Sequence, residues 1–372
     1  MIESAGIESI TARSLEIPFR VMFSHASASR DSTHSLWVEA KTRDGASGYG
    51  EGCPRDYVTG ETLKGALTFV SRHTGTWLEE IYDLDTLATW VRAYRTEIDD
   101  NPAAWCAVEL ALLDAFSKQA GKTTEALLGL PGISGKFHYT AVIGDSSAQR
   151  FEAELSRYQQ AGFRDFKIKL SGDPQRDADK IALLKAAGIA PESVRADANN
   201  LWSDADEAIR FLSRLEYRFR AIEEPLRAGD HAGMNRIAQQ ADASIILDES
   251  LLRAEQLSFF SASPARWIVN LRISKMGGLI RSLEVLERVR RSGLRVIVGA
   301  HVGETSLLTR AALTVANAAR DILVAQEGAF GTYLLEHDVV DPPITFGAGG
   351  VLDASTLPSG PGFGIAVSFP SA

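Results

Sequence analysis

Cysteines, long apolar runs and clustered basic residues are all scarce in this chain of 372 residues. The two cysteines, Cys53 and Cys106, show no CxxC or Cys/His spacing, which argues against a disulfide-stapled secreted fold and against a zinc module. No apolar run is long enough to span a bilayer, and the N-terminus lacks the basic start and apolar core of a signal peptide. The sequence therefore predicts a cytoplasmic protein.

An excess of positive charge is lacking as well. The chain carries 39 Lys and Arg residues against 48 Asp and Glu residues, which gives a formal net charge of -9. This balance provides no electrostatic footprint for nucleic acid or for an anionic membrane. We therefore expect neither nucleic acid nor a membrane as a partner.

The part of the chain before residue 126 has the pattern of an α+β unit. Strand-like composition occurs at 7–19 and 35–52, the second with a turn at Asp44-Gly45. Helical periodicity follows at 62–78 and 103–121. Two strand regions followed by two helices favour an α+β arrangement.

From about residue 136, short apolar runs alternate with amphipathic stretches at a near-constant interval. Eight such α/β units are what a (β/α)₈ barrel needs. The rival fold, an open doubly wound sheet, usually carries a glycine-rich phosphate turn after its first strand, and 142–149 is not one. The eight runs are 137–143, 165–170, 193–197, 219–224, 244–248, 266–271, 295–299 and 322–327.

Acidic residues end three consecutive runs of this predicted barrel. They are Asp197, then Glu223 with Glu224, then Asp248 with Glu249. Because the active groups of a barrel lie at the C-terminal ends of its strands, these carboxylates should meet at one rim. Carboxylates that close cannot all stay ionised without a cation, and oxygen ligands alone favour Mg²⁺. For any one of them, the alternative is a helix N-cap.

Lysines flank these acids. Lys167 and Lys169 lie in the second run, and Lys275 follows the sixth. The second and sixth strands of an eight-stranded barrel lie opposite each other, so amines from both would face a metal-bound substrate from two sides. This arrangement suits removal of a proton next to a carboxylate, with one amine as the base. The neighbouring positive charges should depress the pKa of one amine. The alternative for the lysine pair, a solvated edge strand, requires that the barrel be rejected.

The order KxK, Asp-x-Asn, Glu-Glu-Pro, Asp-Glu-Ser and Lys-x-Gly-Gly resembles the enolase superfamily. Within it, the chain is most similar to the mandelate racemase/muconate lactonizing enzyme family and its muconate-lactonizing-enzyme subgroup. The resemblance implies a modified TIM barrel, (β/α)₇β, at 126–350 and an α+β capping domain at 1–125. It also implies that the C-terminal segment 351–372 returns to the capping domain, and that the protein is a homo-oligomer, either a dimer or an octamer.

The resemblance further implies roles for individual residues. Lys169 matches the acid/base, Lys167 matches the partner that tunes it and contacts the substrate carboxylate, and Lys275 matches the opposing lysine. The Mg²⁺ ligands that it implies are Asp197, Glu223 and Asp248, and the groups that support them from behind are Asn199 and Glu249.

The implied reaction is Mg²⁺-dependent removal of the α-proton of a carboxylate substrate through an enediolate. Its net outcome is cycloisomerisation, racemisation or epimerisation. A dehydratase acting on an acid sugar or a hydroxy amino acid is the enzymatic alternative, and a barrel kept only as a binding module is the non-enzymatic one. Dipeptide epimerases of the subgroup carry Asp-x-Asp at the eighth strand, where this chain has VAQEGAFG at 324–331. This difference disfavours a dipeptide substrate.

Substrate contacts should come from the capping loops 19–29 and 53–62 and from the barrel rim. Each loop candidate could equally be a solvated side chain. His301 is not assigned as a base, because the sixth run already supplies Lys275, and a rim position explains it equally well. The candidates are Arg20, His25, Arg55, Tyr57, Asn270, His301 and Glu327.

Overall fold

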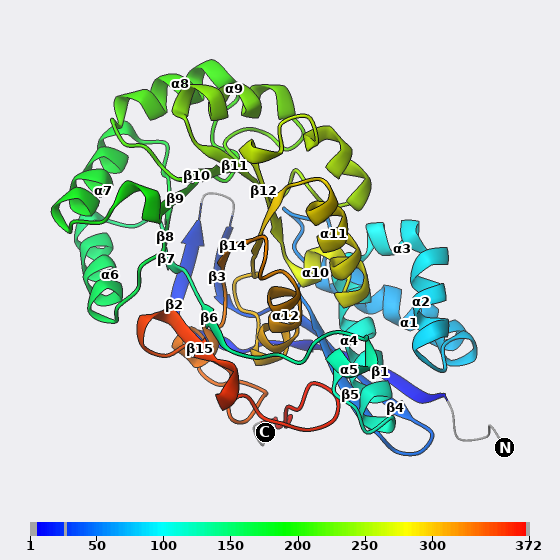
Figure 1. Ribbon diagram of the computed structural model, residues 1–372. Helices are drawn as coiled ribbons and strands as arrows, with labels where there is room; N and C mark the ends of the chain where they lie inside the picture. The colour runs from blue at the N-terminus through cyan, green and yellow to red at the C-terminus, as the bar shows by residue number, and fades with distance from the viewer. Residues whose placement is uncertain (1–5, 26–27, 370–372) are drawn as a thin grey trace.

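The central element is a curled parallel sheet of eight strands with helices on its outer side (Figure 1). The computed structural model describes residues 6–25 and 28–369, of which 21–25 and 28–29 as backbone only. The strand order runs from β14 back to β7 without interruption, as in a barrel built by consecutive β–α units. Each of the eight predicted runs contains one of these strands, so the predicted α/β barrel is confirmed. The strands are β7 (Ala141–Ile143), β8 (Phe166–Lys169), β9 (Val194–Asp197), β10 (Ala221–Glu223), β11 (Ser244–Leu247), β12 (Trp267–Leu271), β13 (Arg295–Val298) and β14 (Leu323–Gln326).

Seven connections join these strands. The fifth contains two 3₁₀ helices, Ala254–Phe260 and Pro264–Arg266, and the others contain α-helices that cover the outside of the sheet. Small and β-branched side chains fill the barrel interior, where Ala221, Ile246, Ile268, Ile297 and Ala325 form a separate core. The helices are α6 (Ala148–Gln160), α7 (Pro174–Ala186), α8 (Ala205–Arg214), α9 (His231–Ala241), α10 (Ile273–Met276), α11 (Leu279–Arg291) and α12 (Ser306–Ala318).

The N-terminal part contains an antiparallel sheet in the order β1-β4-β5 and a hairpin of β2 with β3. The predicted helices at 62–78 and 103–121 are α1 and α4, while α2 and α3 between them were not predicted. The elements are β1 (Ile7–Leu15), β2 (Pro18–His25), β3 (Ala28–Ser32), β4 (Ser35–Thr42), β5 (Ser47–Gly52), α1 (Leu63–Glu80), α2 (Leu84–Ala93), α3 (Arg95–Asp100), α4 (Pro102–Gln119) and α5 (Thr124–Leu127).

A glycine stripe (Gly48, Gly50 and Gly52) holds β5 directly against the backbone of α4. The three glycines share one face of the strand, because side chains alternate along it. A Cβ added at Gly50 would lie 1.9 Å from the carbonyl oxygen of Ala107, and the neighbouring glycines are equally tight, at 2.1 and 1.9 Å from carbonyls of the same helix. No side chain larger than hydrogen fits at these positions.

Gly50→Ala is therefore expected to destabilise the protein by about 2–3 kcal/mol or more, because the strand must move away from the helix. Gly75→Ala is the matched control, since Gly75 lies inside α1 with nothing within 4 Å of an added Cβ. The same substitution there should stabilise the protein by about 0.5–1 kcal/mol, because alanine is the better helix former. Urea unfolding of both variants measures the two effects, and equal midpoints would contradict the argument.

The C-terminal segment packs along the seam between the two parts. β15 (Val351–Asp353) pairs antiparallel with β6 (Lys136–His138), just before the barrel begins. Further on, the backbone NH of Phe363 donates to Asp114 Oδ1 on α4 at 2.9 Å. Arg310 of α12 donates to Phe363 O at 2.9 Å and forms a two-pronged buried pair with Glu125 of α5. The tail thus binds helices from both parts.

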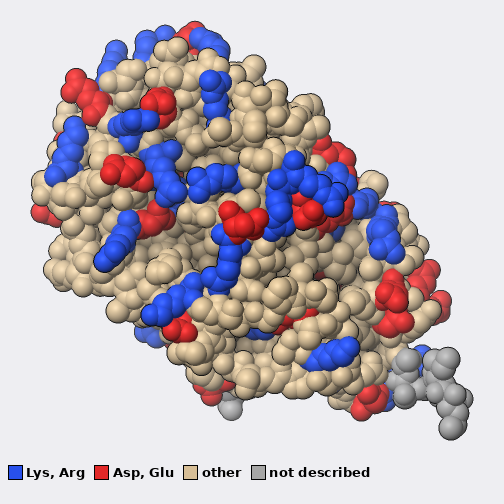
Figure 2. Space-filling view, in the orientation of Figure 1, with Lys and Arg blue, Asp and Glu red and all other residues tan. Residues whose placement is uncertain are grey.

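The surface has no single dominant sign of charge on the face that Figure 2 shows, where basic and acidic side chains are interspersed. Across residues 6–25 and 28–369, no helix combines the length and the apolar character needed to cross a membrane.

Candidate active site

A cavity of about 1060 Å³ opens at the C-terminal ends of the barrel strands. Its lining comes from β8, from the segments that follow β12, β13 and β14, from α6 and from the capping loop 53–62. The residues singled out in the sequence that line it are Tyr57, Lys167, Lys169, Asn199, Glu249, His301 and Glu327.

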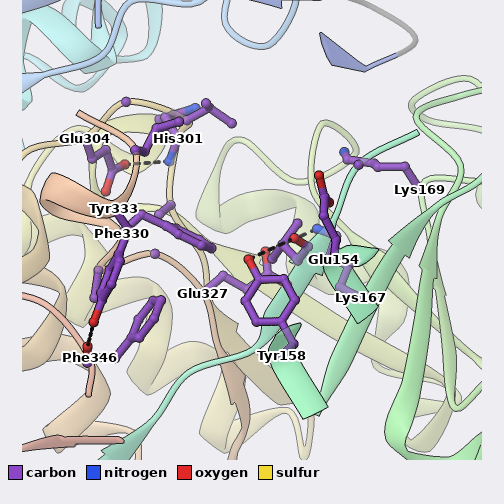
Figure 3. A pocket seen from close by; sticks show the side chains of 18 of the residues that line it. Glu154, Tyr158, Lys167, Lys169, His301, Glu304, Glu327, Phe330, Tyr333 and Phe346 are labelled. Atoms are coloured by element: carbon purple, nitrogen blue, oxygen red, sulfur yellow. Dashed lines mark hydrogen bonds and ion pairs between the residues drawn. The ribbon is translucent and has the colours of Figure 1, made fainter. Parts of the chain in front are cut away.

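The two lysines of β8 lie at one end of this cavity (Figure 3). Lys169 Nζ donates to Asp197 Oδ2 at 2.6 Å and to Asn199 Oδ1 at 2.8 Å. Lys167 Nζ lies 2.7 Å from Glu223 Oε2 and 3.2 Å from Glu327 Oε2. Burial alone would lower the pKa of Lys167, but the surrounding carboxylates outweigh it and raise that pKa. Lys167 therefore remains an ammonium ion.

The sheet register brings the carboxylates to one level. Lys169 is the strand partner of Asp197, and Asp197 is the partner of Glu223 on the next strand. Asp248 follows directly after β11. All three carboxylates are almost fully buried beneath the cavity floor.

Cations lie between these acids. Lys167 bridges Asp197 and Glu223, and Arg272 pairs with Asp248 and lies 3.6 Å from Glu223 Oε1. Within the described ranges, no three carboxylate, imidazole or thiol groups converge as a ready metal cluster. Glu223 Oε2 has the Lys167 ammonium as its partner, at 2.7 Å. Burial and repulsion by Asp197 raise the pKa of Glu223 to about 7, although Lys167 opposes this.

The two acids that follow the predicted ligands differ in their surroundings. Glu224 is a structural carboxylate, because it accepts hydrogen bonds from the backbone NH groups of Asp248 and Ser250 at 2.6 and 2.8 Å. Glu249 lines the cavity, and its Oε2 has no hydrogen-bond partner among the residues described. Burial and the charge of Asp248 raise its pKa well above the usual range.

Lys275 does not occupy the position expected of an opposing base. Its buried Nζ donates to Asp248 O at 2.7 Å, to Asp248 Oδ1 at 2.9 Å and to Asn270 O at 2.8 Å, and the residue lies outside the cavity lining. Arg272 lines the cavity instead. The reason is local: Arg272 directly follows β12, whereas Lys275 lies in the short helix α10, from which its side chain reaches back under the strand ends. The prediction that Lys275 is the cation opposite Lys169 is therefore corrected. Arg272 occupies that position instead.

His301 and Glu304 lie on the segment after β13, next to Arg272. His301 Nδ1 is 3.4 Å from Arg272 Nη1, and the backbone NH of His301 donates to Glu304 Oε1 at 2.6 Å. Burial and the nearby arginines lower the pKa of His301 well below its usual range, so the imidazole is neutral. Burial raises the pKa of Glu304 to about 8.

Glu51 of β5 joins the capping sheet to this same segment. Its carboxylate is fully buried and accepts hydrogen bonds from the Thr305 hydroxyl at 2.6 Å and from the Thr305 backbone NH at 3.1 Å. Burial raises its pKa to about 7 in spite of these hydrogen bonds.

This burial predicts a pH effect on stability. Between about pH 4.5 and 7 the folded state holds a proton on Glu51 that the unfolded state has lost, so stability falls as the pH rises through this window. Glu51→Gln cannot take up this proton. Over the same pH window, the free energy of unfolding of the variant should therefore fall by roughly 1–3 kcal/mol less than that of the wild type. Urea unfolding at pH 5 and pH 8 measures the difference, with the exposed Glu79→Gln as the control. An unchanged pH slope in Glu51→Gln would refute it.

Several predicted substrate contacts are used for other purposes. Arg20 donates to the main-chain carbonyls of Thr332, Leu335 and Glu336, and Arg55 donates to four main-chain carbonyls, including that of Val302. Asn270 is turned beneath the floor, where its Nδ2 donates to Glu223 Oε1 at 3.1 Å. The side chain of His25 lies outside the described residues. Tyr57, His301 and Glu327 are the predicted contacts that do line the cavity.

Several residues in and under the cavity were not singled out by the sequence pattern. Arg195 lies under the floor, where its Nη1 is 2.9 Å from Glu327 Oε1. Arg272 and Glu304 belong to the rim, and an aromatic group lies at the far end of the cavity. The position of Arg272 directly after β12 is a signal that could have marked it, whereas Glu304 lies six residues beyond the end of β13. The aromatic residues of the cavity are Tyr158, which lies nearer the middle, and Phe163, Phe330, Tyr333 and Phe346.

Curated proteins similar to this chain include epimerases. The chain is 24% identical to the hydrophobic dipeptide epimerase of Enterococcus faecalis over 334 residues, which cover 87% of this chain and 91% of the relative. It is 29% identical to the L-Lys-D/L-Arg epimerase of Methylococcus capsulatus over 306 residues, which cover 80% and 82% of the two chains.

Solved structures agree in fold. The L-Ala-D/L-Glu epimerase from Bacillus subtilis, in a substrate-liganded complex, superposes with a TM-score of 0.86 at 22% identity and covers 98% of this chain and 100% of its own. The dipeptide epimerase from Enterococcus faecalis, complexed with Mg and the dipeptide L-Leu-L-Tyr, gives a TM-score of 0.81 at 24% identity, covering 97% and 99%. The sequence model of the enolase C-terminal domain-like family matches residues 150–371. The chain therefore belongs to the enolase superfamily, with the barrel domain of the mandelate racemase/muconate lactonizing enzyme type.

Proposed function

We propose that this protein is an isomerase that removes the α-proton of a carboxylate substrate, with Lys169 as the base and epimerisation or racemisation as the net reaction. The observation that carries the proposal is the position of Lys169. Its amine lines the cavity and has two acceptors, Asp197 and Asn199, which fix its direction toward the substrate space. A positioned amine of this kind can take a proton from a substrate carbon held above it.

Lys167 acts as the fixed positive charge beside the base. It remains protonated because three carboxylates surround it, among them Glu327 at 3.2 Å. A permanent ammonium ion next to the substrate carboxylate would bind that carboxylate and favour loss of the α-proton. Arg195 holds Glu327 from below and so keeps the pair aligned.

A divalent metal fits the acids beneath the floor. Asp197, Glu223 and Asp248 offer oxygen ligands only, which Mg²⁺ prefers, and all three carboxylates are buried together under the cavity. These three residues would hold it, and Asn199 and Glu249 would border it. When bound, Mg²⁺ would supply positive charge to the substrate carboxylate as negative charge develops there.

The names of the relatives support one substrate class. The lack of Asp-x-Asp at the eighth strand disfavours a dipeptide, yet several similar proteins are named dipeptide epimerases. We therefore propose the wider class of amino acids that carry a free carboxylate and a substituent on nitrogen. It includes dipeptides, as the names of the relatives suggest, and N-acyl amino acids, which have no ammonium ion for an Asp-x-Asp to bind. In this class the α-carbon next to the carboxylate bears the proton that Lys169 would remove.

A second candidate is a reaction confined to one face of the α-carbon, such as elimination or cycloisomerisation. Arg272, rather than a lysine, presents the cation opposite Lys169, and a guanidinium ion does not lose its proton in proteins. A reaction on both faces then requires another group on the far side, and the neutral imidazole of His301 lies beside Arg272.

Deuterium exchange tests both candidates. Dipeptides and N-acyl amino acids are incubated with the protein and Mg²⁺ in D₂O, starting separately from each epimer at the α-carbon. Exchange from both epimers, with the opposite epimer accumulating, supports epimerisation, and His301→Asn should then suppress exchange from one epimer more than from the other. Exchange from one epimer alone favours the second candidate. No Mg²⁺-dependent exchange in any compound of the panel refutes the proposal.

A further inference from the structure

The cavity extends well beyond the space that a small amino-acid carboxylate needs. Its volume of about 1060 Å³ lies at the upper limit of ordinary ligand pockets. Figure 3 shows Lys167 and Lys169 at one side, Tyr158 in the middle and Phe330, Tyr333 and Phe346 gathered at the other side. We call the far end of the cavity, which is lined by Phe163, Phe330, Tyr333 and Phe346, the aromatic slot.

The slot exists because the barrel is not closed by a full ladder between its first and last strands. Thr140 N donates to Gln326 O at 2.9 Å, and Gln326 Nε2 donates to the Tyr139 hydroxyl at 2.8 Å, so contact is made where β7 begins. In the described chain, no ladder pairing joins 141–143 to β14. The cavity continues into this gap, between α6 on one side and the segment after β14 on the other.

The aromatic rings of the slot hold one another in place. Phe346 is at the centre, with ring centroids 5.4 Å from both Phe163 and Phe330 in edge-on contact and 5.1 Å from Tyr333 in a stacked one. Tyr333 is 59% exposed although its hydroxyl donates to Phe346 O at 3.2 Å. A large, exposed aromatic ring that is held this rigidly does little for the core, and it suits a ligand contact.

The backbone after β14 is strained where it delivers Phe330. Gly328, Ala329 and Gly331 all have positive φ angles, of 106°, 55° and 40°. For alanine this conformation costs about 1–3 kcal/mol, and such strain concentrates at functional sites. A Cβ at Gly331 would lie 2.6 Å from Thr345 Cγ2, so this position of the turn requires glycine. The turn places Phe330 in the lining of the cavity.

The charged side chains beside the slot lie on α6 at its rim, where the Arg157 guanidinium carbon is 5.2 Å from the ring centroid of Tyr158. At the rim, Arg150 Nε pairs with Glu154 Oε1 at 3.0 Å, one helical turn apart on α6. The tyrosine at the middle of the cavity donates its hydroxyl to Val142 O at 3.4 Å. An uncharged group therefore fits the slot better than an ionised one.

We infer that the aromatic slot binds an uncharged aryl group carried by the substrate at the end remote from its carboxylate. This inference rests on the proposed function for the position of the carboxylate, near Lys167. It specifies the substrate further, as an acylated amino acid or similar compound whose substituent carries an aromatic ring across the cavity.

Two glycine derivatives test the inference, because a glycine α-carbon has no epimer and binding is measured without net reaction. N-acetylglycine and N-(3-phenylpropanoyl)glycine are titrated into the full chain with Mg²⁺ by calorimetry. Burial of a phenyl ring predicts about ten-fold or tighter binding of the aryl compound. Ala348→Trp, which fills the exposed rim of the slot, and Phe330→Ala, which removes one wall, should each reduce this ratio toward one.

Phe259→Ala is the control. Phe259 is a 64% exposed ring on the 3₁₀ helix Ala254–Phe260, outside the cavity lining, so this variant should keep the wild-type ratio of the two affinities. Any of three results would overturn the inference. These are equal affinities for the two compounds, no detectable binding of the aryl compound, and an affinity ratio that is unchanged in both slot variants. Deuterium uptake into the glycine methylene separates the two proposals. Uptake with equal affinities refutes the slot alone, whereas an aryl preference without uptake supports the slot and refutes the proposed function.

Discussion

Lys169→Ala is expected to lower the rate of α-proton exchange by about 10²–10⁴-fold, the usual contribution of a positioned general base. Lys169 is the amine that combines access to the cavity with fixed acceptors, at 2.6 Å to Asp197 Oδ2 and 2.8 Å to Asn199 Oδ1. The neighbouring Lys167 cannot replace it, because the carboxylates around that lysine keep it protonated. The measurement is deuterium incorporation in D₂O at saturating substrate.

Lys169→Arg separates a catalytic loss from a structural one. It keeps the positive charge next to Asp197 but offers no base, so it should be as slow as the alanine variant while unfolding at a urea concentration near that of the wild type. Lys185→Ala is the control, since Lys185 is exposed on the outer helix α7. Exchange at the wild-type rate in Lys169→Arg would eliminate this lysine as the base.

Asp248→Asn is expected to destabilise the protein by about 3–5 kcal/mol and to abolish its response to Mg²⁺. Asp248 is the shared partner of two buried cations, Lys275 at 2.9 Å and Arg272. Neutralising it leaves both positive charges under the floor without their main counterion. It also removes one of the three proposed metal ligands, so added Mg²⁺ should no longer raise the stability of the folded state.

Urea unfolding at increasing MgCl₂ concentration measures both effects. In the wild type the midpoint should rise with Mg²⁺, and in Asp248→Asn it should be low and independent of Mg²⁺. Asp204→Asn is the control: Asp204 caps α8 by accepting from Glu207 N at 2.9 Å, and asparagine caps a helix about as well. A midpoint in Asp248→Asn that still rises with Mg²⁺ as in the wild type would rule out Asp248 as a ligand.

The barrel, and the residues that lie at its C-terminal rim, were predictable from the sequence. Strand alternation and the order of the strands determine which side chains reach one edge. The order of Lys169, Asp197 and Glu223 around the rim follows from these two rules, whereas the register that pairs Lys169 with Asp197, and Asp197 with Glu223, comes from the structure. The choice between Arg272 and Lys275 was not predictable in this way. Lys275 lies in α10, beyond the end of β12, and the direction of a side chain from a one-turn helix depends on tertiary contacts.

The same limit applies to the capping loops and to the aromatic slot. Arg20 and Arg55 have the composition of substrate-binding cations, but main-chain carbonyls far along the sequence take up their donors. The slot draws its rings from the turn after α6 and from the segment after β14, so no periodic pattern connects them. Sequence patterns identify residues that share an element, whereas these sites are assembled from several elements.

The glycine stripe of β5 also bears on how this protein can change over evolutionary time. A strand that rests on helix backbone has no side chains whose size can be adjusted, so single substitutions cannot shift β5 by small steps. Glu51, carried by that strand, therefore holds the segment of His301 and Glu304 at a fixed distance. New substrate preferences should accordingly arise by replacements in the 53–62 loop and in the turn after β14, while the strand–helix pair stays constant.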